Sequence, residues 1–341
     1  MLIPPKYFLT PKISQFLSSI EASREIINTI SIPYEVETNI RRQSYLKSSL
    51  FSARIEGNTL TLDDISTKSS KDQKKIEVFN IIKAINLTFQ KRSKDITTKD
   101  ILTIHEIVMN GFARDLGKFR NEANAIFNTA GIAVYMPPPP RQIPNLMEKL
   151  LKYVNSTKEP LVPVRACLTH YMFEKIHPFL DGNGRVGRIL LQNVLQKAGY
   201  GMKGIVAIEE YLDSHRSLYY LGLENSEKDV TDYLEFILEA LANAAEQGKM
   251  LVLEKKKSEP EDFLLPRRAE IFRIIQDHKM VNFDQIRRRF MAINERTLRY
   301  DLKKLADGGL IKKLGTTKGV YYEIKENPRL LVTLVPFEIL F

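Results

Sequence analysis

The stretch HPFLDGNGRVGR, residues 177–188, brings a histidine, an acid, glycines and two arginines together, and an apolar run, ILLQNVL, follows it. Gly182 and Gly184 can adopt backbone angles that other residues avoid, so successive N–H groups can turn inward around an anion. A helix that begins near Arg185 adds the positive end of its dipole at the same place. The stretch therefore predicts a binding site for a polyphosphate.

The charged residues of this stretch indicate what the site does with the phosphates. Arg185 and Arg188 are three positions apart, so both project from one side of the first helical turn, where guanidinium groups can hold phosphates. Asp181 lies at the mouth of this cradle, where a carboxylate can share Mg²⁺ with phosphate oxygens. His177 can take a proton from an incoming hydroxyl if its imidazole is neutral. Together they predict transfer of a phosphorus-containing group to a hydroxyl.

Each of these residues alone has an ordinary structural explanation. A Gly-Asn-Gly sequence is usually only a turn, and two arginines on one helix face usually lie on a solvated surface. The prediction depends on their combination in a fixed order, together with Phe179, which we expect to anchor the loop in the core.

Length, charge and cysteine content restrict the class of protein. A chain of 341 residues is long enough for a main domain and one or two smaller ones, and its formal charge of +10 favours anionic partners. The lone Cys167 excludes an internal disulfide and is expected to be a small buried residue. The N-terminus lacks a signal-peptide pattern, and no apolar run approaches the roughly 20 residues that span a bilayer. We expect a cytoplasmic protein with no membrane partner.

Periodicity along the chain predicts a mainly α fold with four segments. Residues 1–95 repeat apolar side chains at helical spacing and predict an N-terminal helical region. Residues 96–253 continue this pattern, except that GKFRNEANAIFNTAGIAVYMPPPP predicts a short β-hairpin followed by an extended segment. The charged, proline-containing residues 254–262 predict a linker, and residues 263–341 predict a separate C-terminal domain.

The C-terminal domain resembles a winged helix-turn-helix. Three predicted helices, with Asn282 and Asn294 as caps of the second and third, precede two short strands about a Gly-Thr-Thr-Lys-Gly turn. If the leucines of the third helix face inward, its basic and aromatic side chains face outward, where they can reach DNA bases and phosphates. The candidate DNA contacts are Arg296, Arg299, Tyr300, Lys303 and, in the turn, Lys318. Winged helices also mediate protein contacts, so a homodimer is an open alternative.

The central stretch matches the motif HxFx[DE]GNGRxxR in full, and the chain resembles the Fic family over roughly residues 35–245. Most members transfer AMP from Mg-ATP to a Tyr, Ser or Thr hydroxyl of a target protein. The resemblance implies that His177 is the base, that Asp181 holds Mg²⁺, and that Asn183 with the neighbouring glycine backbone forms an anion hole. Gly184, where phosphorylating Doc toxins commonly carry lysine, resembles the AMP-transferring branch. The implied ATP contacts in the motif are Asp181, Gly182, Asn183, Gly184, Arg185, Val186, Gly187 and Arg188.

Two further segments resemble parts of the same family that surround the nucleotide. NEANAIF resembles the flap hairpin, which aligns a target segment by backbone pairing. LYYLGLEN resembles the segment on the adenine side, although paired tyrosines on a helix are equally well explained by core packing. The nucleotide contacts implied by these segments are Asn124, Ala125, Ile126, Phe127, Tyr219, Tyr220 and Asn225.

SARIEGN, residues 52–58, contains Gly57, which we expect to end the preceding helix as a C-cap, and it matches the inhibitory motif [ST]xxxE[GN] of Fic proteins that carry their own brake. The resemblance implies that Glu56 pairs with Arg188 and occupies the guanidinium intended for the γ-phosphate of ATP. In some relatives the same glutamate supports removal of AMP, and that reverse reaction stays open here. Also open are the target, which includes the chain itself, another nucleotide donor, and a DNA-binding regulator whose winged helix is the main functional module.

Overall fold

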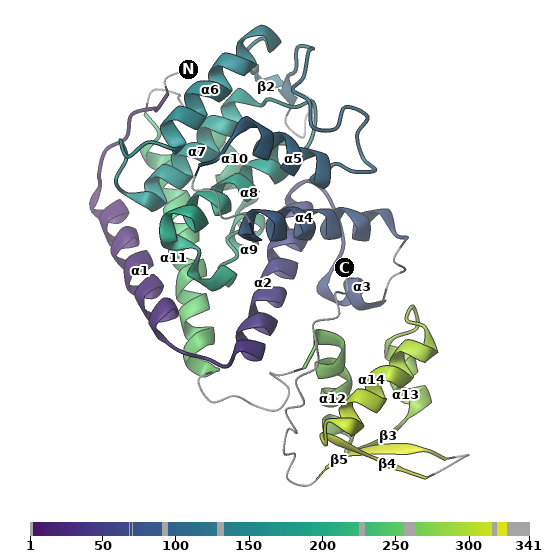
Figure 1. Ribbon diagram of the computed structural model, residues 1–341. Helices are drawn as coiled ribbons and strands as arrows, with labels where there is room; N and C mark the ends of the chain where they lie inside the picture. Colours follow the sequence, from purple (N-terminus) through teal and green to yellow (C-terminus); the bar gives the residue numbers. More distant parts are fainter. Residues whose placement is uncertain are drawn as a thin grey trace. The chain divides into compact units, whose positions relative to one another are not determined.

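The computed structural model describes residues 3–67, 69, 71–90, 95–127, 133–224, 229–255, 264–315 and 319–325. The chain is mainly helical, as the sequence predicts (Figure 1). It divides into two compact units, of which unit 1 is Met1–Ser31, Ser44–Leu60 and Gln73–Glu254 and unit 2 is Ile32–Gln43, Thr61–Asp72 and Lys255–Phe341. The domain boundaries inferred from sequence pattern stay predictions. In the described residues no helix is both long and apolar enough to cross a membrane.

Unit 1 is an assembly of helices with one two-stranded ribbon. Its α-helices are α1 (Pro11–Thr29), the later part of α2 (Tyr34–Ile55), α4 (Gln73–Gln90), α5 (Thr98–Val108), α6 (Ile143–Val154), α7 (Val162–Ile176), α8 (Asn183–Leu195), α9 (Glu209–Ser214), α10 (Arg216–Glu224) and α11 (Thr231–Glu254). Three short helical turns are η1 (Pro140–Gln142), η2 (Gln196–Tyr200) and η3 (Met202–Gly204).

Helices α7 and α8 are the buried centre of unit 1. Nearly every residue of both helices is buried, and α5 packs against α8 while α6 and α11 pack against α7 (Figure 1). Helix α1 belongs to the surrounding layer and lies along α11. Ile13, Ile20 and Ile27 are seven residues apart and form one fully buried stripe on α1. The loop that joins α7 to α8 therefore stands on a rigid base, which is what a precisely arranged site needs.

The hairpin occurs where the sequence predicts it. Strand β1 (Ile126–Phe127) pairs antiparallel with β2 (Ala133–Tyr135), with Ile126 opposite Tyr135 and an irregularity in register between Ile126 and Phe127. Both strands are very short, and a two-stranded ribbon of this size is marginal by itself. Its position therefore depends on contacts with the rest of unit 1, among them the hydrogen bond from Oη of Tyr135 to the backbone oxygen of Lys175 at 2.9 Å.

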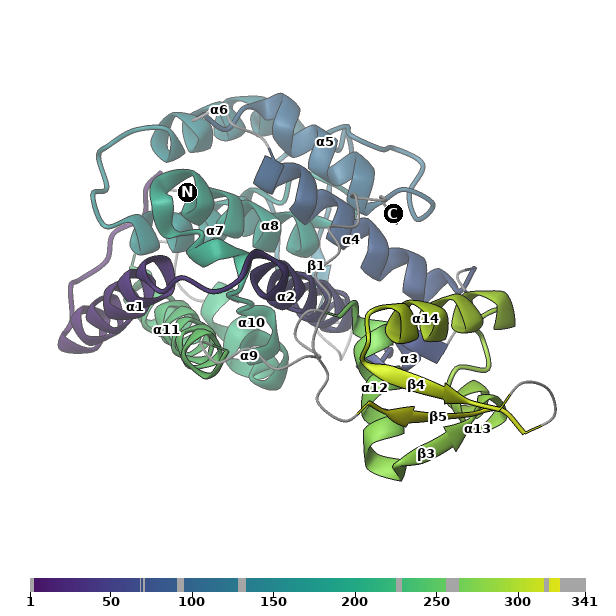
Figure 2. The same cartoon turned by 60° about the horizontal axis from the view of Figure 1, so that its bottom comes forward.

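Unit 2 combines helices with a three-stranded antiparallel sheet. It contains the first part of α2, α3 (Leu62–Thr67), α12 (Pro266–His278), β3 (Met280–Asn282), α13 (Phe283–Arg289), α14 (Glu295–Asp307), β4 (Ile311–Leu314) and β5 (Tyr321–Ile324). Figure 2 shows β5 between β3 and β4. Asn282 and Asn294 cap α13 and α14, as the sequence predicts.

Strand β3 is an element that the sequence analysis missed. It has only three residues, of which one is buried, so no alternating pattern marks it. The resulting order of helix, strand, two helices and two strands is the order expected of a winged helix. The assignment to that class stays a prediction.

Candidate active site

His177 ends α7 in a left-handed backbone conformation, with φ 48° and ψ 62°. Its Nδ1 lies 3.3 Å from the backbone oxygen of Glu174. Because a carbonyl oxygen only accepts hydrogen bonds, Nδ1 carries the hydrogen in this contact and Nε2 keeps its lone pair. Burial lowers the pKa of His177 to about 4, and the nearby cation of Arg120 acts in the same direction. The ring is therefore neutral near pH 7 and has one nitrogen free to take a proton.

The loop after His177 is closed by the side chain of Asn183. Oδ1 of Asn183 accepts the backbone N–H of Phe179 at 2.9 Å, and Nδ2 donates to the backbone oxygen of Phe179 at 2.9 Å. The Phe179 ring is fully buried and stacks on His105 with ring centroids 3.8 Å apart, as expected of an anchor. The amide of Asn183 is thus used inside the loop, which leaves its backbone N–H, and not its side chain, for an anion.

Helix α8 begins at Asn183, two residues before the predicted start near Arg185. Gly182 precedes it with φ 82°, and a Cβ there would lie 2.6 Å from Sδ of Met109. A Cβ on Gly184 would overlap Oε1 of Glu56. At Gly182 the positive φ favours glycine, whereas at Gly184 the nearest atom is the end of the Glu56 side chain, which can shift. The first N–H groups of α8 form the positive end of the helix dipole, where an anion can bind.

Arg185 lies between two carboxylates, with only 6% of its side chain exposed. Its Nη1 donates to Oε1 of Glu77 at 2.6 Å, and its Nη2 donates to Oδ1 of Asp181 at 2.9 Å. The second oxygen of Glu77 accepts from Nδ2 of Asn58 at 2.9 Å. Glu77 therefore joins Arg185 to the segment that follows α2. The sequence analysis missed Glu77, because a glutamate in a lysine-rich helix has no distinguishing local signal.

Arg188 is buried, with 1% of its side chain exposed, and its guanidinium meets the end of α2. Nε donates to Oγ of Ser52 at 3.0 Å, and Nη2 donates to the backbone oxygen of Ser52 at 2.9 Å and to Oε1 of Glu56 at 2.8 Å. Burial lowers the pKa of Arg188, but the charge and hydrogen bond of Glu56, together with the nearby Tyr219 and Glu174, outweigh burial and raise that pKa. The predicted ion pair is present; its role as a brake stays a proposal.

The end of α2 holds Glu56 in place. Gly57, with φ 99°, donates to the backbone oxygen of Arg54 at 3.0 Å, and the next N–H donates to Ala53 O at 3.0 Å, which is a glycine C-cap as predicted. Oη of Tyr220 donates to the backbone oxygen of Ile55 at 3.1 Å. Tyr220 thus satisfies one of the free carbonyl groups at the helix end.

A buried polar cluster lies within electrostatic range of Arg188. Nδ1 of His170 is 2.6 Å from Oη of Tyr233, and its Nε2 is 3.1 Å from Oη of Tyr219. Oε1 of Glu174 lies 3.7 Å from Nε2 of His170. Burial lowers the pKa of His170 to about 3 and raises the pKa of Glu174 to about 8. Both groups are therefore mainly uncharged at neutral pH.

The two tyrosines of the predicted adenine-side segment differ in environment. Tyr219 is 1% exposed and belongs to the buried cluster, so core packing explains its side chain. Tyr220 is 42% exposed and lies at the surface, where a ligand could contact it. Asn225 lies outside the described residues. Within the motif, Val186 is fully buried and Gly187 has Oε1 of Glu174 where its Cβ would be. Neither Val186 nor Gly187 therefore offers a side chain to a nucleotide.

The flap residues begin beside the catalytic loop. Nδ2 of Asn124 donates to the backbone oxygen of Leu180 at 3.4 Å, and Oδ1 of Asn124 accepts the N–H of Ala125 at 2.9 Å. Ile126 and Phe127 form β1. The structure therefore brings the flap and the motif together, while contact of these four residues with a nucleotide stays a prediction.

The donor set fits a magnesium ion shared with phosphates better than a metal held by protein alone. The side chain of Asp181 is 64% exposed at the rim of the cradle. Among the described residues, no group of three or more His, Cys, Asp or Glu side chains could hold a metal. Mg²⁺ commonly takes one or two carboxylates and completes its shell with phosphate oxygens and water, so Asp181 suits that role.

Comparison with known proteins identifies the domain that carries this site. Residues 95–195 match the Fic/DOC family. The chain carries a Fic domain. Curated relatives include the protein adenylyltransferases Fic of Drosophila sechellia and Drosophila melanogaster, each 32% identical over 237 residues, or 65% of this chain and 45% of the relative. The chain thus spans less than half the length of these relatives.

Solved structures resemble the fold of this chain over more than the matched residues. A Fic family protein from Desulfovibrio desulfuricans G20 is 24% identical, with a TM-score of 0.64 over 95% of this chain and 99% of that chain. A Fic domain containing signaling protein from Bacteroides thetaiotaomicron is 20% identical, with a TM-score of 0.58 over 73% of this chain and 99% of that chain. At these identities the likeness concerns the fold alone.

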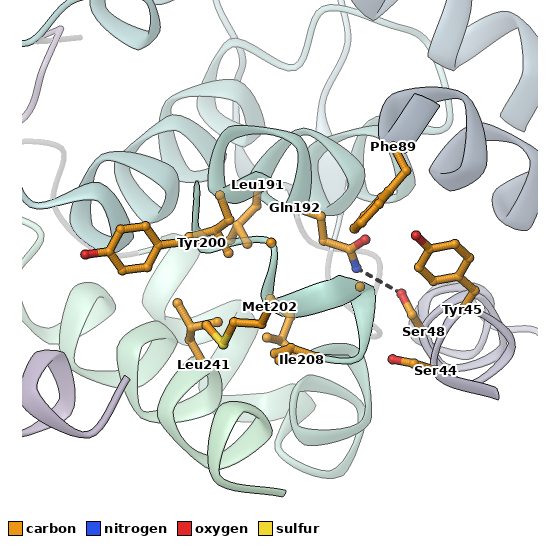
Figure 3. Close-up of a pocket in the computed structure, with 14 residues that line it drawn as sticks. Ser44, Tyr45, Ser48, Phe89, Leu191, Gln192, Tyr200, Met202, Ile208 and Leu241 are labelled. Carbon is orange, nitrogen blue, oxygen red and sulfur yellow. Dashed lines mark hydrogen bonds between the residues drawn. The ribbon is translucent and has the colours of Figure 1, made fainter. Parts of the chain in front are cut away.

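A small cavity on another part of α8 is distinct from the site of the Fic motif. It measures about 30 Å³ and lies among residues of α2, α8, α11 and the loop after η3 (Figure 3). At one side of the cavity, Nε2 of Gln192 donates hydrogen bonds to Oγ of Ser48 at 2.9 Å and to Oε1 of Glu209 at 2.6 Å. A volume of this size holds about one or two water molecules and is too small for a nucleotide.

The predicted DNA contacts of unit 2 lie on one helix face. Leu298, Leu302 and Leu305 are buried in the core of this unit, so α14 turns the opposite face outward. The exposed members of that face are Arg296, Arg299, Tyr300 and Lys303. Arg299 is also engaged within the unit, since its Cζ lies 3.9 Å from the ring centroid of Phe283 and its Nη2 lies 3.5 Å from Glu295. Lys318 lies outside the described residues.

Proposed function

We propose that this Fic domain transfers AMP from Mg-ATP to a Tyr, Ser or Thr hydroxyl of a protein. The observation that carries the proposal is the neutral His177, whose Nε2 has no hydrogen-bond partner among the described residues, on the same loop and helix as two buried arginines and the N-terminus of α8. The curated relatives named protein adenylyltransferase support the same chemistry.

The residues divide the reaction between them. The target hydroxyl oxygen attacks the α-phosphorus, the bond from that phosphorus to the β-bridging oxygen breaks, and pyrophosphate leaves. Nε2 of His177 takes the hydroxyl proton. The N–H groups at the start of α8 stabilise negative charge on the phosphates, and Asp181 would hold Mg²⁺, which neutralises part of that charge when bound.

We propose further that Glu56 is a brake on this reaction. Nη2 of Arg188 is the group best suited to a terminal phosphate, and Glu56 already occupies it. Because Arg188 has 1% of its side chain exposed, a phosphate can reach this nitrogen only if the carboxylate leaves. Until then ATP binds with its phosphates displaced from the in-line arrangement.

Intact-mass spectrometry tests donor, base and brake together. Wild type, Glu56→Gly and Glu56→Gly/His177→Ala are incubated with Mg-ATP, Mg-GTP, Mg-UTP or Mg-CTP, alone and with a cell extract containing candidate targets. We expect added AMP only with ATP, most in Glu56→Gly and none in the double variant. Transfer by the double variant at the rate of Glu56→Gly would overturn the role of His177. Transfer from another nucleotide would overturn the choice of donor.

A second proposed function, DNA binding by unit 2, is supported by the exposed basic face of α14. Retention of the full chain on duplex DNA at increasing salt tests it, with Arg299→Glu compared with Arg273→Glu on the exposed surface of α12. Loss of retention in Arg299→Glu alone is the expected result, and equal retention of both variants refutes it. Self-modification, homodimer formation and removal of AMP stay open alternatives.

A further inference from the structure

We propose that Arg120 is a positioning residue that fixes the base His177 and both ends of the flap to one another. The inference rests on the proposed function, in which His177 takes the proton and the flap aligns the target. Arg120 lies before the flap in the segment GKFRNEANAIF, and no sequence motif singled it out.

The guanidinium of Arg120 bridges three parts of the site through their backbone. Nε donates to the backbone oxygen of His177 at 2.8 Å, Nη1 to that of Glu122 at 2.8 Å, and Nη2 to that of Pro138 at 2.5 Å. The backbone N–H of Arg120 donates to Pro178 O at 2.9 Å. Glu122 precedes β1 and Pro138 follows β2, so one side chain fastens both ends of the flap to the loop of the base.

The burial of Arg120 argues for a specific role. Only 4% of the residue is exposed, and burial lowers its pKa. A buried arginine is usually accompanied by a carboxylate. In the described part of the chain, the groups that hydrogen-bond to this guanidinium are carbonyl oxygens. The planar guanidinium has donors in fixed directions, so it sets the positions of these oxygens more narrowly than a lysine ammonium would.

The contact also fixes a strained conformation. His177 has φ 48°, which is disfavoured for any residue other than glycine. Arg120 holds the carbonyl of His177 and the carbonyl of the following residue, so the left-handed turn is secured from outside the loop. Without this hold, the flap keeps its contacts from Asn124 to the oxygen of Leu180 and from Tyr135 to the oxygen of Lys175, but the carbonyl of His177 loses its link to both flap ends. The distance from base to target hydroxyl is then set less narrowly.

The placement of Arg120 predicts which kinetic constant depends on it. Its hydrogen bonds go to the base and the flap, whereas the phosphate cradle is made by Arg185, Arg188 and the start of α8. Substitution should therefore lower kcat for AMP transfer and leave KM for Mg-ATP unchanged. A merely structural defect would lower the amount of folded protein, which lowers the apparent kcat without changing KM, so kcat is expressed per folded molecule.

The kinetic test uses the Glu56→Gly background, in which the proposed brake is released. Arg120→Lys keeps the charge and loses the fork, and it should lower kcat about 10- to 100-fold, as misplacement of reacting groups by about 1 Å does. Arg165→Lys is the matched control, because Arg165 also donates to a backbone oxygen, that of Ser156 at 2.8 Å, from the other end of α7. The control should leave kcat and KM within about twofold of the background.

A second measurement does not depend on turnover. Hydrogen exchange of the flap amides in β1 and β2 should become about tenfold faster in Arg120→Lys and stay unchanged in Arg165→Lys, because only the first releases the flap ends. Unchanged flap exchange, unchanged kcat, or a loss confined to KM would each overturn the proposal. If Glu56→Gly transfers no AMP at all, the proposed function fails, and flap exchange alone then decides the role of Arg120.

Discussion

Removal of the Glu56 carboxylate should have two opposite effects, because Glu56 both blocks and stabilises Arg188. Its Oε1 lies 2.8 Å from Nη2 of a guanidinium that is 1% exposed, while Glu56 itself is 27% exposed. In Glu56→Gly the nitrogen becomes available to a phosphate. Arg188 keeps its two hydrogen bonds to Ser52, so the guanidinium stays in place.

The size of the gain follows from the contact that is lost. A hydrogen bond between charged groups contributes about 1.5–3 kcal/mol net, and each 1.4 kcal/mol is a factor of ten. If displacement of Glu56 opposes productive binding of ATP by that amount, the rate of AMP transfer should rise roughly 10- to 100-fold. Glu56→Gln keeps an acceptor but loses the charge, and it should give an intermediate rate.

The cost should appear in stability without nucleotide. Removing one partner of a buried ion pair leaves the other charge uncompensated, typically at about 3–5 kcal/mol, and the remaining bonds to Ser52 reduce this figure. The neighbouring Glu174 supplies little compensation, because burial raises its pKa to about 8. The melting temperature should fall in Glu56→Gly and recover with Mg-ATP by more than in wild type.

The assay combines both measurements on one preparation. AMP incorporation is followed by intact mass, and unfolding is followed by circular dichroism with and without Mg-ATP. Glu56→Gly/His177→Ala separates the effects, since it should bind nucleotide as tightly as Glu56→Gly and transfer none. A transfer rate for Glu56→Gly within twofold of wild type, or a nucleotide-free melting temperature equal to wild type, would refute the reasoning.

Three further predictions concern the residues around the cradle. In the Glu56→Gly background, His177→Ala should lower the transfer rate about 10²- to 10⁴-fold with unchanged ATP affinity, measured by calorimetry; weakened affinity would contradict its assignment as base. Burial raises the pKa of Glu174 from 4.5 to about 8, so between these pH values only the unfolded state loses this proton, and the stability of the fold decreases as pH rises. Burial lowers the pKa of His170 to about 3, so its effect is the opposite: the stability of the fold decreases as pH falls below 6.5. Glu174→Gln should abolish the fall in unfolding free energy between about pH 6.5 and 8, and denaturant titrations that keep this fall would contradict it. Gly187→Ala should destabilise the fold by about 1–3 kcal/mol because its Cβ would overlap Oε1 of Glu174 and lie 3.1 Å from Phe173, while Gly222→Ala, with its nearest neighbour at 3.4 Å, should not; equal melting temperatures would refute this.

The sequence predicted those features that depend on neighbours in the chain. Gly57 ends α2 because a left-handed C-cap favours glycine, and Asn282 and Asn294 cap their helices because their side chains reach N–H groups two or three residues ahead. The Fic motif is equally local, since the base, the anchor and the helix start lie on one loop. The predicted start of α8, near Arg185, is two residues later than the observed start at Asn183, because the side chain of Asn183 bonds back to the backbone of Phe179.

The sequence did not predict the residues that approach the motif from elsewhere. Glu77 meets Arg185 across 108 positions, and Arg120 meets His177 across 57. No periodicity or cap relates such pairs, because tertiary packing brings α4 and the segment between α5 and β1 to the motif. Glu174 was overlooked for another reason. It lies on a helix of ordinary pattern, and its burial, with 9% of the residue exposed, is what separates it from a surface glutamate.

The two arginines of the cradle are neutralised by different means, and this asymmetry bears on how ATP would enter. Glu77 is 12% exposed on a continuous helix and holds Arg185 while its second oxygen binds Asn58. Glu56 is 27% exposed and lies just beyond the end of α2. Of the two carboxylates, Glu56 has fewer restraints, so an incoming phosphate would displace it and leave Glu77 in place.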